Sequence, residues 1–216
     1  MLVGAYGFGV SVSFFGLGFW PALAVAILCA VVFALILGIP TLKLRGDYLA
    51  IVTIAAAEII RMILRMAMLT DVTGGPAGLH STKYAYVFAE LSPLPEGRTD
   101  ILGLDYANTG GNDWWIRIVA WALVALFILI TWALVRSPWG RVLKGIREDE
   151  DAVRSLGKSS YAYKMQALIL GGVMGAIGGI VMTMPSAMQP DGMARPMTFN
   201  LWMIMLLGGA ATIFGP

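Results

Sequence analysis

The sequence has little charge, one cysteine and one histidine, and each scarcity excludes a class of protein. Only 13% of its 216 residues are charged, whereas soluble domains usually carry about 25%. With 58% hydrophobic residues, the chain cannot cover a soluble surface. A lone cysteine, Cys29, excludes an intrachain disulfide, and a lone histidine, His80, excludes a metal site built from several histidines. The composition therefore predicts an integral membrane protein.

Motifs of enzymes and of nucleotide binding are also absent from the sequence. There is no Walker A pattern, no HExxH, no GxSxG and no CxxC. Charge is nearly balanced, with 15 Lys and Arg against 13 Asp and Glu, so no basic surplus favours nucleic acid. We therefore expect a chain that is not an enzyme, that holds no metal or cofactor of its own, and that binds no nucleic acid.

Long hydrophobic runs are what the sequence does contain. A helix needs about 20 apolar residues to cross a bilayer. Six stretches approach or reach that length: Leu2–Phe19, Phe19–Ile39, Tyr48–Leu69, Trp114–Val135, Met165–Met184 and Met197–Phe214. Each should be helical, because lipid offers no partners for free backbone groups. The prediction is one all-α, polytopic membrane domain over residues 1–216, with about six transmembrane helices.

The basic residues predict how this domain is oriented. Seven of them lie between residues 136 and 164: Arg136, Arg141, Lys144, Arg147, Arg154, Lys158 and Lys164. Lys43 and Arg45 precede the third run, whereas the segment 70–113 holds only Lys83 and Arg98. Cytoplasmic loops carry the excess of Lys and Arg. We therefore expect a cytoplasmic loop over 136–160 and a long periplasmic loop over 70–113.

Helix signals lie within the 136–160 loop. Ser137 before Pro138 is typical of an N-cap and first helical residue. The acids Glu148–Asp151 suit the start of a second helix, and Gly157 suits its end. Apolar residues fall on one side of each helix: Val142, Leu143 and Ile146, then Val153 and Leu156. The pattern predicts two short amphipathic helices joined by an acidic turn, packed against the chain's own bundle or against a partner.

A pair of opposite charges lies inside the third apolar run. Glu58 is followed three residues later by Arg61, close enough for a bond on one helix face. A charge at the bilayer centre costs roughly 2.5–3.5 kcal/mol on insertion scales, so it should be paired or meet water. Two interpretations stay open: a buried ion pair, and a polar group beside a translocation path.

An outer turn is predicted directly after the third run. Thr73-Gly74-Gly75-Pro76 combines two glycines, which allow unusual backbone angles, with a proline that can start a short helix. This turn either closes the loop or forms part of an outer gate or a dock for a binding protein.

Glycines also mark one face of the fifth run. Gly171, Gly175 and Gly179 are spaced four apart, and small residues at that spacing let another helix approach closely. We expect this face to pack against another helix, with a functional hinge as the alternative.

Four stretches together point to a known family. In chain order they are LKLRGDYLAIVTIAAAEIIR (Leu42–Arg61), TGGPAGL (Thr73–Leu79), SPWGRVLKGIREDEDAVRSLG (Ser137–Gly157) and YKMQALILGGVMGAIGGI (Tyr163–Ile180). The third fits a loose signature of Glu-Ala-Ala, three residues and Gly, with Asp151 and Val153 as departures. These stretches resemble permeases of the high-affinity branched-chain amino acid family of bacterial ABC importers. Members of that family are usually longer, which implies that this chain is part of a longer protein.

The resemblance implies a function, partners and site residues. It implies a multi-pass permease of the bacterial inner membrane that moves branched-chain amino acids. Its expected partners are two cytoplasmic ABC ATPase subunits, which would hold ATP and Mg, a second related permease and a periplasmic substrate-binding protein. The residues expected to couple to the ATPases are Arg147, Glu148, Asp149, Glu150, Asp151, Ala152, Val153 and Gly157. Alternatives are a permease for urea, amides or other amino acids, and an ATP-independent secondary transporter or channel.

Overall fold

The computed structural model describes residues 1–42, 46–92, 97–101, 104–108 and 113–209, and it is dominated by α-helices. The α-helices are α1 Leu2–Ser13, α2 Phe19–Thr41, α3 Gly46–Leu64, α4 Thr70–Thr73, α5 Tyr86–Ala89, α6 Asp113–Arg136, α7 Pro138–Glu148, α8 Glu150–Ser155, α9 Ser160–Thr183 and α10 Arg195–Gly208. Single 3₁₀ turns lie at η1 Ala67–Leu69, η2 Gly75–Ala77, η3 Ser81–Lys83 and η4 Asp191–Met193. This architecture confirms the prediction of an all-α polytopic membrane protein.

Three of the described helices, α2, α6 and α9, are long and apolar enough to cross a membrane. Helix α3 has 19 residues but carries charge, and α1 and α10 have only 12 and 14 residues. A count of six transmembrane helices therefore stays a prediction, and the expected end of the last run at Phe214 lies outside the described residues.

Two predicted runs end earlier than expected. The first helix stops at Ser13 rather than Phe19, and the chain turns at Gly16 with a φ of 61°. The third stops at Leu64 rather than Leu69, because Met66 adopts an extended conformation and a 3₁₀ turn follows it. Hydrophobicity continues past both ends, so composition alone does not mark them.

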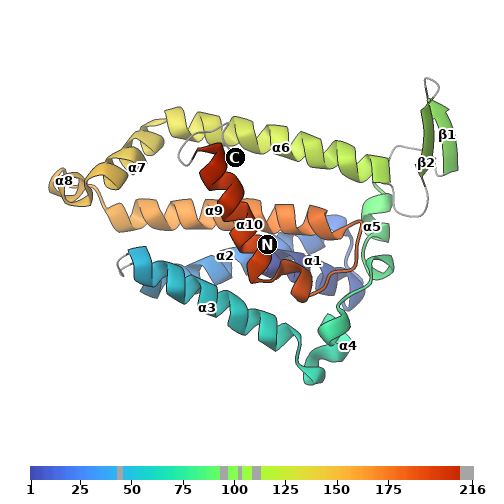
Figure 1. Ribbon diagram of the computed structural model, residues 1–216. Helices are drawn as coiled ribbons and strands as arrows, with labels where there is room; N and C mark the ends of the chain where they lie inside the picture. The colour runs from blue at the N-terminus through green and yellow to red at the C-terminus, as the bar shows by residue number, and fades with distance from the viewer. Residues whose placement is uncertain (43–45, 93–96, 102–103, 109–112, 210–216) are drawn as a thin grey trace.

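Helices α1, α2 and α9 pack closely through small residues (Figure 1). Thr41 and five small residues of α2 are buried, and the five are four residues apart: Ala22, Ala26, Ala30, Ala34 and Gly38. A Cβ added to Gly38 would lie 2.7 Å from Sδ of Met165 on α9, and one on Gly4 of α1 would lie 2.3 Å from Cβ of Ala176. Close backbone approach is how helices associate in lipid, where apolar surface alone gives little preference.

The glycine face of α9 contributes to this packing, but in a shifted register. Gly179 is buried, and a Cβ there would lie 2.6 Å from the carbonyl oxygen of Met1. Gly175 has room for ordinary contact with Met1, and a Cβ on Gly172 would meet Ala34 of α2 at 3.6 Å. A Cβ on Gly171 meets no described atom within 4 Å. The contact with α2 therefore uses Gly172 rather than Gly171.

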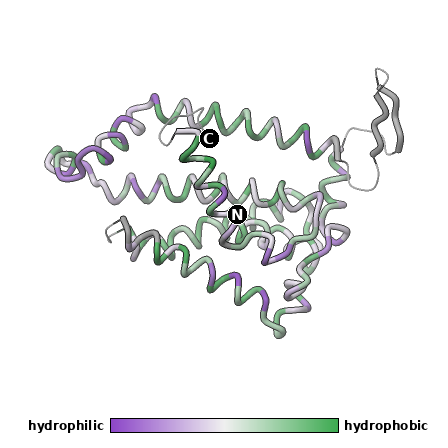
Figure 2. Tube along the Cα trace, viewed as in Figure 1, coloured by the Kyte–Doolittle hydropathy of each residue, from purple (hydrophilic) through white to green (hydrophobic). Residues whose placement is uncertain are grey.

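The two loops that were assigned to opposite sides lie at opposite ends of the bundle. Helices α7 and α8 project at one end, where α2 ends and α3 begins, whereas α4, α5 and a β-hairpin lie at the other (Figure 1). Hydrophilic residues are concentrated along α7 and α8 (Figure 2). Lys43 and Arg45, which contribute to the predicted orientation, lie outside the described residues. The arrangement matches the separation that the loop charges predict.

The long outer loop expected over 70–113 has structure of its own. It contains the short helices α4 and α5, and strand β1 (Gly97–Ile101) pairs antiparallel with β2 (Leu104–Asn108), with Gly97 opposite Asn108. Dense turn residues gave no periodic signal for this hairpin.

Candidate functional site

Helix α7 begins where α6 ends, and three residues fix the junction. The Ser137 hydroxyl donates to the carbonyl of Leu134 at 2.6 Å and accepts from the amide of Gly140 at 3.4 Å, which makes Ser137 the predicted N-cap. A Cβ on Gly140 would lie 2.5 Å from two carbonyl oxygens of α6. Trp139 Nε1 donates to Oε1 of Gln166 at 2.8 Å. Helix α7 is therefore held on both α6 and α9.

Helix α8 has both ends capped. The Asp149 carboxylate accepts from the amides of Asp151 and Ala152 at 2.9 and 3.0 Å, so it satisfies two free donors of the first turn. At the other end Gly157 has a φ of 74°, and the amides of Gly157 and Lys158 donate to the carbonyls of Arg154 and Val153. This is a Schellman C-cap, and it confirms the helix end that Gly157 predicts.

Glu150 turns inward and joins α8 to α9. Its carboxylate accepts from the Ser160 hydroxyl at 2.8 Å, pairs with Arg154 at 2.9 Å and is bonded to Lys164 of α9. The bonds from Lys164 and Ser160 lower the pKa of Glu150 below its ordinary value. Glu150 was expected among the residues that couple to the ATPases, and the structure shows that it also forms a bridge within the chain.

The remaining residues of this loop divide between an inner and an outer face. Val153 is buried, with its methyl group close to Gly145. Ala152 is exposed, and the side chain of Asp151 is 92% exposed. Leu156, which was expected on the apolar side with Val153, is instead 78% exposed. It follows the last residue of α8, so its side chain leaves the inner face.

The outer face of this loop combines charged and apolar side chains. Arg147 and Glu148 are exposed and pair with each other at 2.9 Å. Ala152 and Leu156, four residues apart on the same loop, are also exposed. We call Arg147, Glu148, Asp151, Ala152 and Leu156 the tip surface.

Glu58 and Arg61 are paired, as one of the two open interpretations requires, and the pair extends to two further charges. Arg61 donates through Nε to Glu58 Oε2 at 3.2 Å and through Nη2 to Oε1. Its Nη1 donates to Asp191 of η4, which also pairs with Arg65 at 3.2 Å. The side chains of Arg61 and Glu58 are 14% and 16% exposed, against 49% for Asp191.

The position of Glu58 along α3 explains how these charges are tolerated. Helix α3 ends at Leu64, six residues later, which is about 9 Å at 1.5 Å per residue. Glu58 therefore lies in the half of α3 nearer the α4 end of the bundle.

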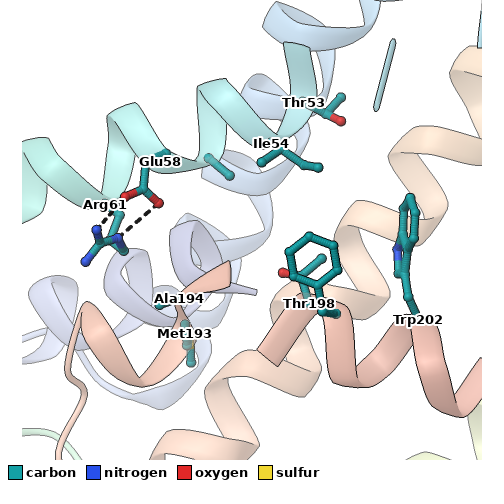
Figure 3. Close-up of a pocket in the computed structure, with 10 residues that line it drawn as sticks. Thr53, Ile54, Glu58, Arg61, Met193, Ala194, Thr198 and Trp202 are labelled. Carbon is teal, nitrogen blue, oxygen red and sulfur yellow. Dashed lines mark hydrogen bonds and ion pairs between the residues drawn. The ribbon is translucent and has the colours of Figure 1, made fainter. Parts of the chain in front are cut away.

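A cleft of about 250 Å³ opens between α3 and α10 beside this ion cluster (Figure 3). Its lining residues come from α3 on one side and from η4 and α10 on the other: Thr53, Ile54, Ala57, Glu58, Arg61, Met193, Ala194, Thr198, Phe199 and Trp202. The charges lie at one end, and Trp202 lies at the other. No group of three His, Cys, Asp or Glu among the described residues is placed to hold a metal ion.

The outer turn adopts the backbone that its glycines predict. Gly74 and Gly75 have φ values of 74° and 58°, and Pro76 lies in the first turn of η2. Thr73 Oγ1 lies 2.9 Å from the carbonyl oxygens of both Leu64 and Leu69, so it closes the chain back onto the end of α3.

This turn is docked on the connection between α9 and α10. Leu79 and Met188 exchange two backbone hydrogen bonds of 3.0 and 2.8 Å. The buried Tyr6 hydroxyl donates to the Met188 carbonyl at 3.0 Å, and that of Tyr84 lies 2.7 Å from the carbonyls of Thr183 and Ser186. Burial raises the pKa of Tyr84 to about 12. Because Asp191 is three residues beyond Met188, the outer turn also positions the partner of Arg61.

Sequence reasoning missed Asp191, Tyr84 and Lys164 as members of these sites. Asp191 and Tyr84 meet their partners Arg61 and Thr183 across 130 and 99 residues, and Lys164 meets Glu150 across 14. An isolated acid such as Asp191, in a Gly- and Pro-containing connection, gives no periodic signal. The one available hint was that Arg61 and Arg65 exceed the single nearby acid, Glu58, on α3.

Comparison with known proteins covers the whole chain. Residues 1–216 match the family described as "Branched-chain amino acid transport system / permease component". The chain is 36% identical over 224 residues to the high-affinity branched-chain amino acid transport system permease protein LivM of Escherichia coli, covering 98% of this chain and 51% of that protein. A probable LivM of Methanocaldococcus jannaschii is 27% identical over 87% of this chain and 50% of its own length.

More distant similarity is confined to part of the chain. The autoinducer 2 import system permease protein LsrC of Photorhabdus laumondii is 28% identical over 47% of this chain and 33% of that protein. No solved structure matches significantly. The chain spans about half the length of the LivM proteins that it matches. With its apolar helices, and with a family match over its full length, the chain belongs to the permease component family of branched-chain amino acid transport systems.

Proposed function

We propose that this chain forms part of the permease subunit of an ABC importer that carries branched-chain amino acids across the bacterial inner membrane. The similarity to LivM proteins supports the solute and the transport role. Two cytoplasmic ATPase subunits, which bind ATP and Mg²⁺, drive transport. A second related permease and a periplasmic substrate-binding protein complete the importer, and the α7–α8 end of the chain faces the cytoplasm.

The observation that carries this proposal is the construction of the α7–α8 loop. Its tip surface leaves Ala152 and Leu156 exposed within a charged rim, a composition that suits a protein partner more than water. Its inner face is bonded to α9 through Glu150 and Trp139. A movement imposed on the tip surface by an ATPase therefore passes to α9, which packs on α1 and α2.

Single cysteines test the orientation. In a Cys29→Ser background, Ser155→Cys on α8 and His80→Cys before η3 place thiols at exposed positions of the two opposite ends. A membrane-impermeant thiol reagent added to whole cells, after permeabilisation of the outer membrane, should label His80→Cys and spare Ser155→Cys until the inner membrane is opened. Labelling of both in intact cells would contradict the assignment of α7 and α8 to the cytoplasm.

Ala152→Arg tests coupling directly. An arginine at the centre of the tip surface should lower ATPase binding and leucine-stimulated hydrolysis at least tenfold, or about 1.4 kcal/mol in binding. The permease that contains this chain is reconstituted with its ATPases and binding protein, and Thr82→Arg, exposed at the opposite end, is the matched control. Unchanged stimulation in Ala152→Arg would remove the tip surface from the docking site.

The same reconstitution separates the alternatives. The partial similarity to LsrC proteins, whose name assigns them to autoinducer 2 import, favours a shared import mechanism with different solutes. Uptake of urea, an amide or another amino acid in place of leucine would change the solute assigned to this permease but leave the ABC import mechanism in place. Leucine uptake that continues without ATPases would instead favour a secondary transporter or channel.

A further inference from the structure

The cleft between α3 and α10 combines groups of three kinds along its length. Glu58 and Arg61 place opposite charges at one end (Figure 3). The body of the cleft is apolar and aromatic, with Ile54, Phe199 and Trp202 in its lining. The lining also includes two hydroxyl residues from opposite walls, Thr53 and Thr198. Its volume of about 250 Å³ lies below the roughly 300–1,000 Å³ of pockets for drug-sized ligands, so it suits a small solute.

The bonds of Arg61 identify which contact can be exchanged. Its Nε and Nη2 bond to Glu58 on the same helix, and the side chains of Arg61 and Glu58 are both mostly buried. Its Nη1 faces Asp191, which comes from a different segment and is 49% exposed. Asp191 has a second cation, Arg65, at 3.2 Å. If another carboxylate takes the place of Asp191 on Arg61, Asp191 keeps a counter-ion and stays near water.

An α-amino acid carries the complementary groups in one small molecule. Its carboxylate matches the guanidinium of Arg61, where planar two-point bonding is favourable, and its ammonium matches the carboxylate of Glu58. Both ends are charged but the molecule is neutral, so its entry leaves the net charge of the cluster unchanged. A branched aliphatic side chain then lies along the apolar body of the cleft.

We propose that this cleft is a transient subsite for the zwitterion of an apolar amino acid, in which the solute carboxylate displaces Asp191 from Arg61 and its ammonium meets Glu58. The inference rests on the proposed function, and it adds the residues that hold the solute in the permease. Competition from Asp191 keeps the affinity low, which suits a step that must also release the solute.

Protection from chemical labelling tests the subsite. Thr198→Cys in a Cys29→Ser background places an exposed thiol in the cleft. In the purified permease that contains this chain, without a binding protein, millimolar leucine should slow modification by a water-soluble thiol reagent. Leucinamide, which lacks the carboxylate, and 4-methylpentanoate, which lacks the ammonium, should protect at least tenfold more weakly. His80→Cys, which is exposed and lies outside the lining of the cleft, should react with the reagent at the same rate with and without each compound.

Two substitutions should shift the leucine concentration needed for half-protection in opposite directions. Asp191→Asn removes the competing carboxylate, so half-protection should need several-fold less leucine. Glu58→Gln removes the partner of the ammonium, so half-protection should need about tenfold more leucine. If the ion cluster is purely structural, Asp191→Asn should not lower the leucine concentration needed for half-protection. Because Asp191 is exposed, this variant remains a valid test even if Glu58→Gln does not fold.

The outcomes separate the subsite from the proposed function. Absence of protection in a permease that transports leucine would overturn the subsite alone, as would equal protection by all three compounds or no gain in Asp191→Asn. Protection by leucine in a permease that does not transport it would support the subsite and contradict the proposed solute. Failure of both protection and leucine transport would overturn both.

Discussion

At the α7–α8 end of the bundle, contacts to α9 are made by side chains that meet water, whereas the opposite end is joined through backbone groups and buried hydroxyls. Glu150 and Lys164 are each 32% exposed, but Tyr84 is fully buried and bonded to carbonyl oxygens. Exposed ion pairs contribute little and are screened by salt, while buried hydrogen bonds are costly to break. The contacts at the first end are therefore the weaker ones, and we call it the yielding end; we call the second the fixed end.

The largest expected effect comes from Gly78→Ala at the fixed end. Gly78 has a φ of 75°, and a Cβ there would lie 2.1 Å from the carbonyl oxygen of Met188. Backbone strain and overpacking together should cost about 3 kcal/mol or more. The measurement is the yield and melting temperature of the purified permease. Gly192→Ala, where a Cβ meets no described atom within 4 Å, is the control. Equal losses in both would show that docking of the outer turn is not what fixes this end.

Tyr84→Phe should have an intermediate effect. Removing the hydroxyl leaves the carbonyls of Thr183 and Ser186 without this donor, at a cost of about 1–3 kcal/mol. Thermal unfolding measures the loss, and Tyr86→Phe, at a 48% exposed tyrosine, should be close to neutral.

Alkaline pH gives an independent measurement on Tyr84. Because burial raises its folded pKa to about 12 from 10, its stabilisation is complete below pH 10 and is lost as pH rises towards 12. This alkaline loss should be smaller in Tyr84→Phe. If it persists unchanged in Tyr84→Phe, another group controls the alkaline transition.

Glu150→Gln should have the smallest effect on stability, about 1 kcal/mol or less, because its partners are partly exposed. Its effect should appear in coupling, measured as leucine-stimulated ATP hydrolysis, and should shrink as salt rises. The variant for comparison is Asp151→Asn, at a side chain of the tip surface that is 92% exposed. Loss of coupling in Asp151→Asn alone would assign transmission to the tip surface rather than to the bridge onto α9.

The pH dependence of the Glu150 bridge has the opposite sign to that of Tyr84. The pKa of Glu150 is lowered in the folded protein, so its contribution is present above the ordinary carboxyl pKa and is lost as pH falls through the lowered value. Acid below the ordinary carboxyl pKa should therefore mimic Glu150→Gln and leave the hydrogen bonds of Tyr84 intact. An acid-resistant contact between α8 and α9 in the wild-type protein would contradict this.

Local signals explain why the sequence predicted the yielding end well. Ser137, Pro138 and Gly157 act on their own neighbours, so helix caps can be recognised without knowledge of the fold. The fixed end depends on pairs such as Tyr84 with Thr183 and Arg61 with Asp191, which no local pattern encodes. Spacing puts Gly171, Gly175 and Gly179 on one face but does not define the orientation of the neighbouring helix, so the contact of Gly172 with α2 was not predicted. Membrane composition predicted the class of fold, whereas helix ends at Ser13 and Leu64 depended on turns within apolar sequence.

The packing of α9 against small residues has a consequence for how the protein is made. Of the three long apolar helices, α9 is the least hydrophobic and the last to leave the ribosome. When it enters the bilayer, α1 and α2 are already there, and the alanine face of α2 offers Gly172 a partner at Ala34. Packing on this face should therefore add to the retention of α9 in lipid, beside the contribution of its own hydropathy. A bulky side chain at Ala34 should act during synthesis, by letting α9 slip back through the translocon before a folded permease exists.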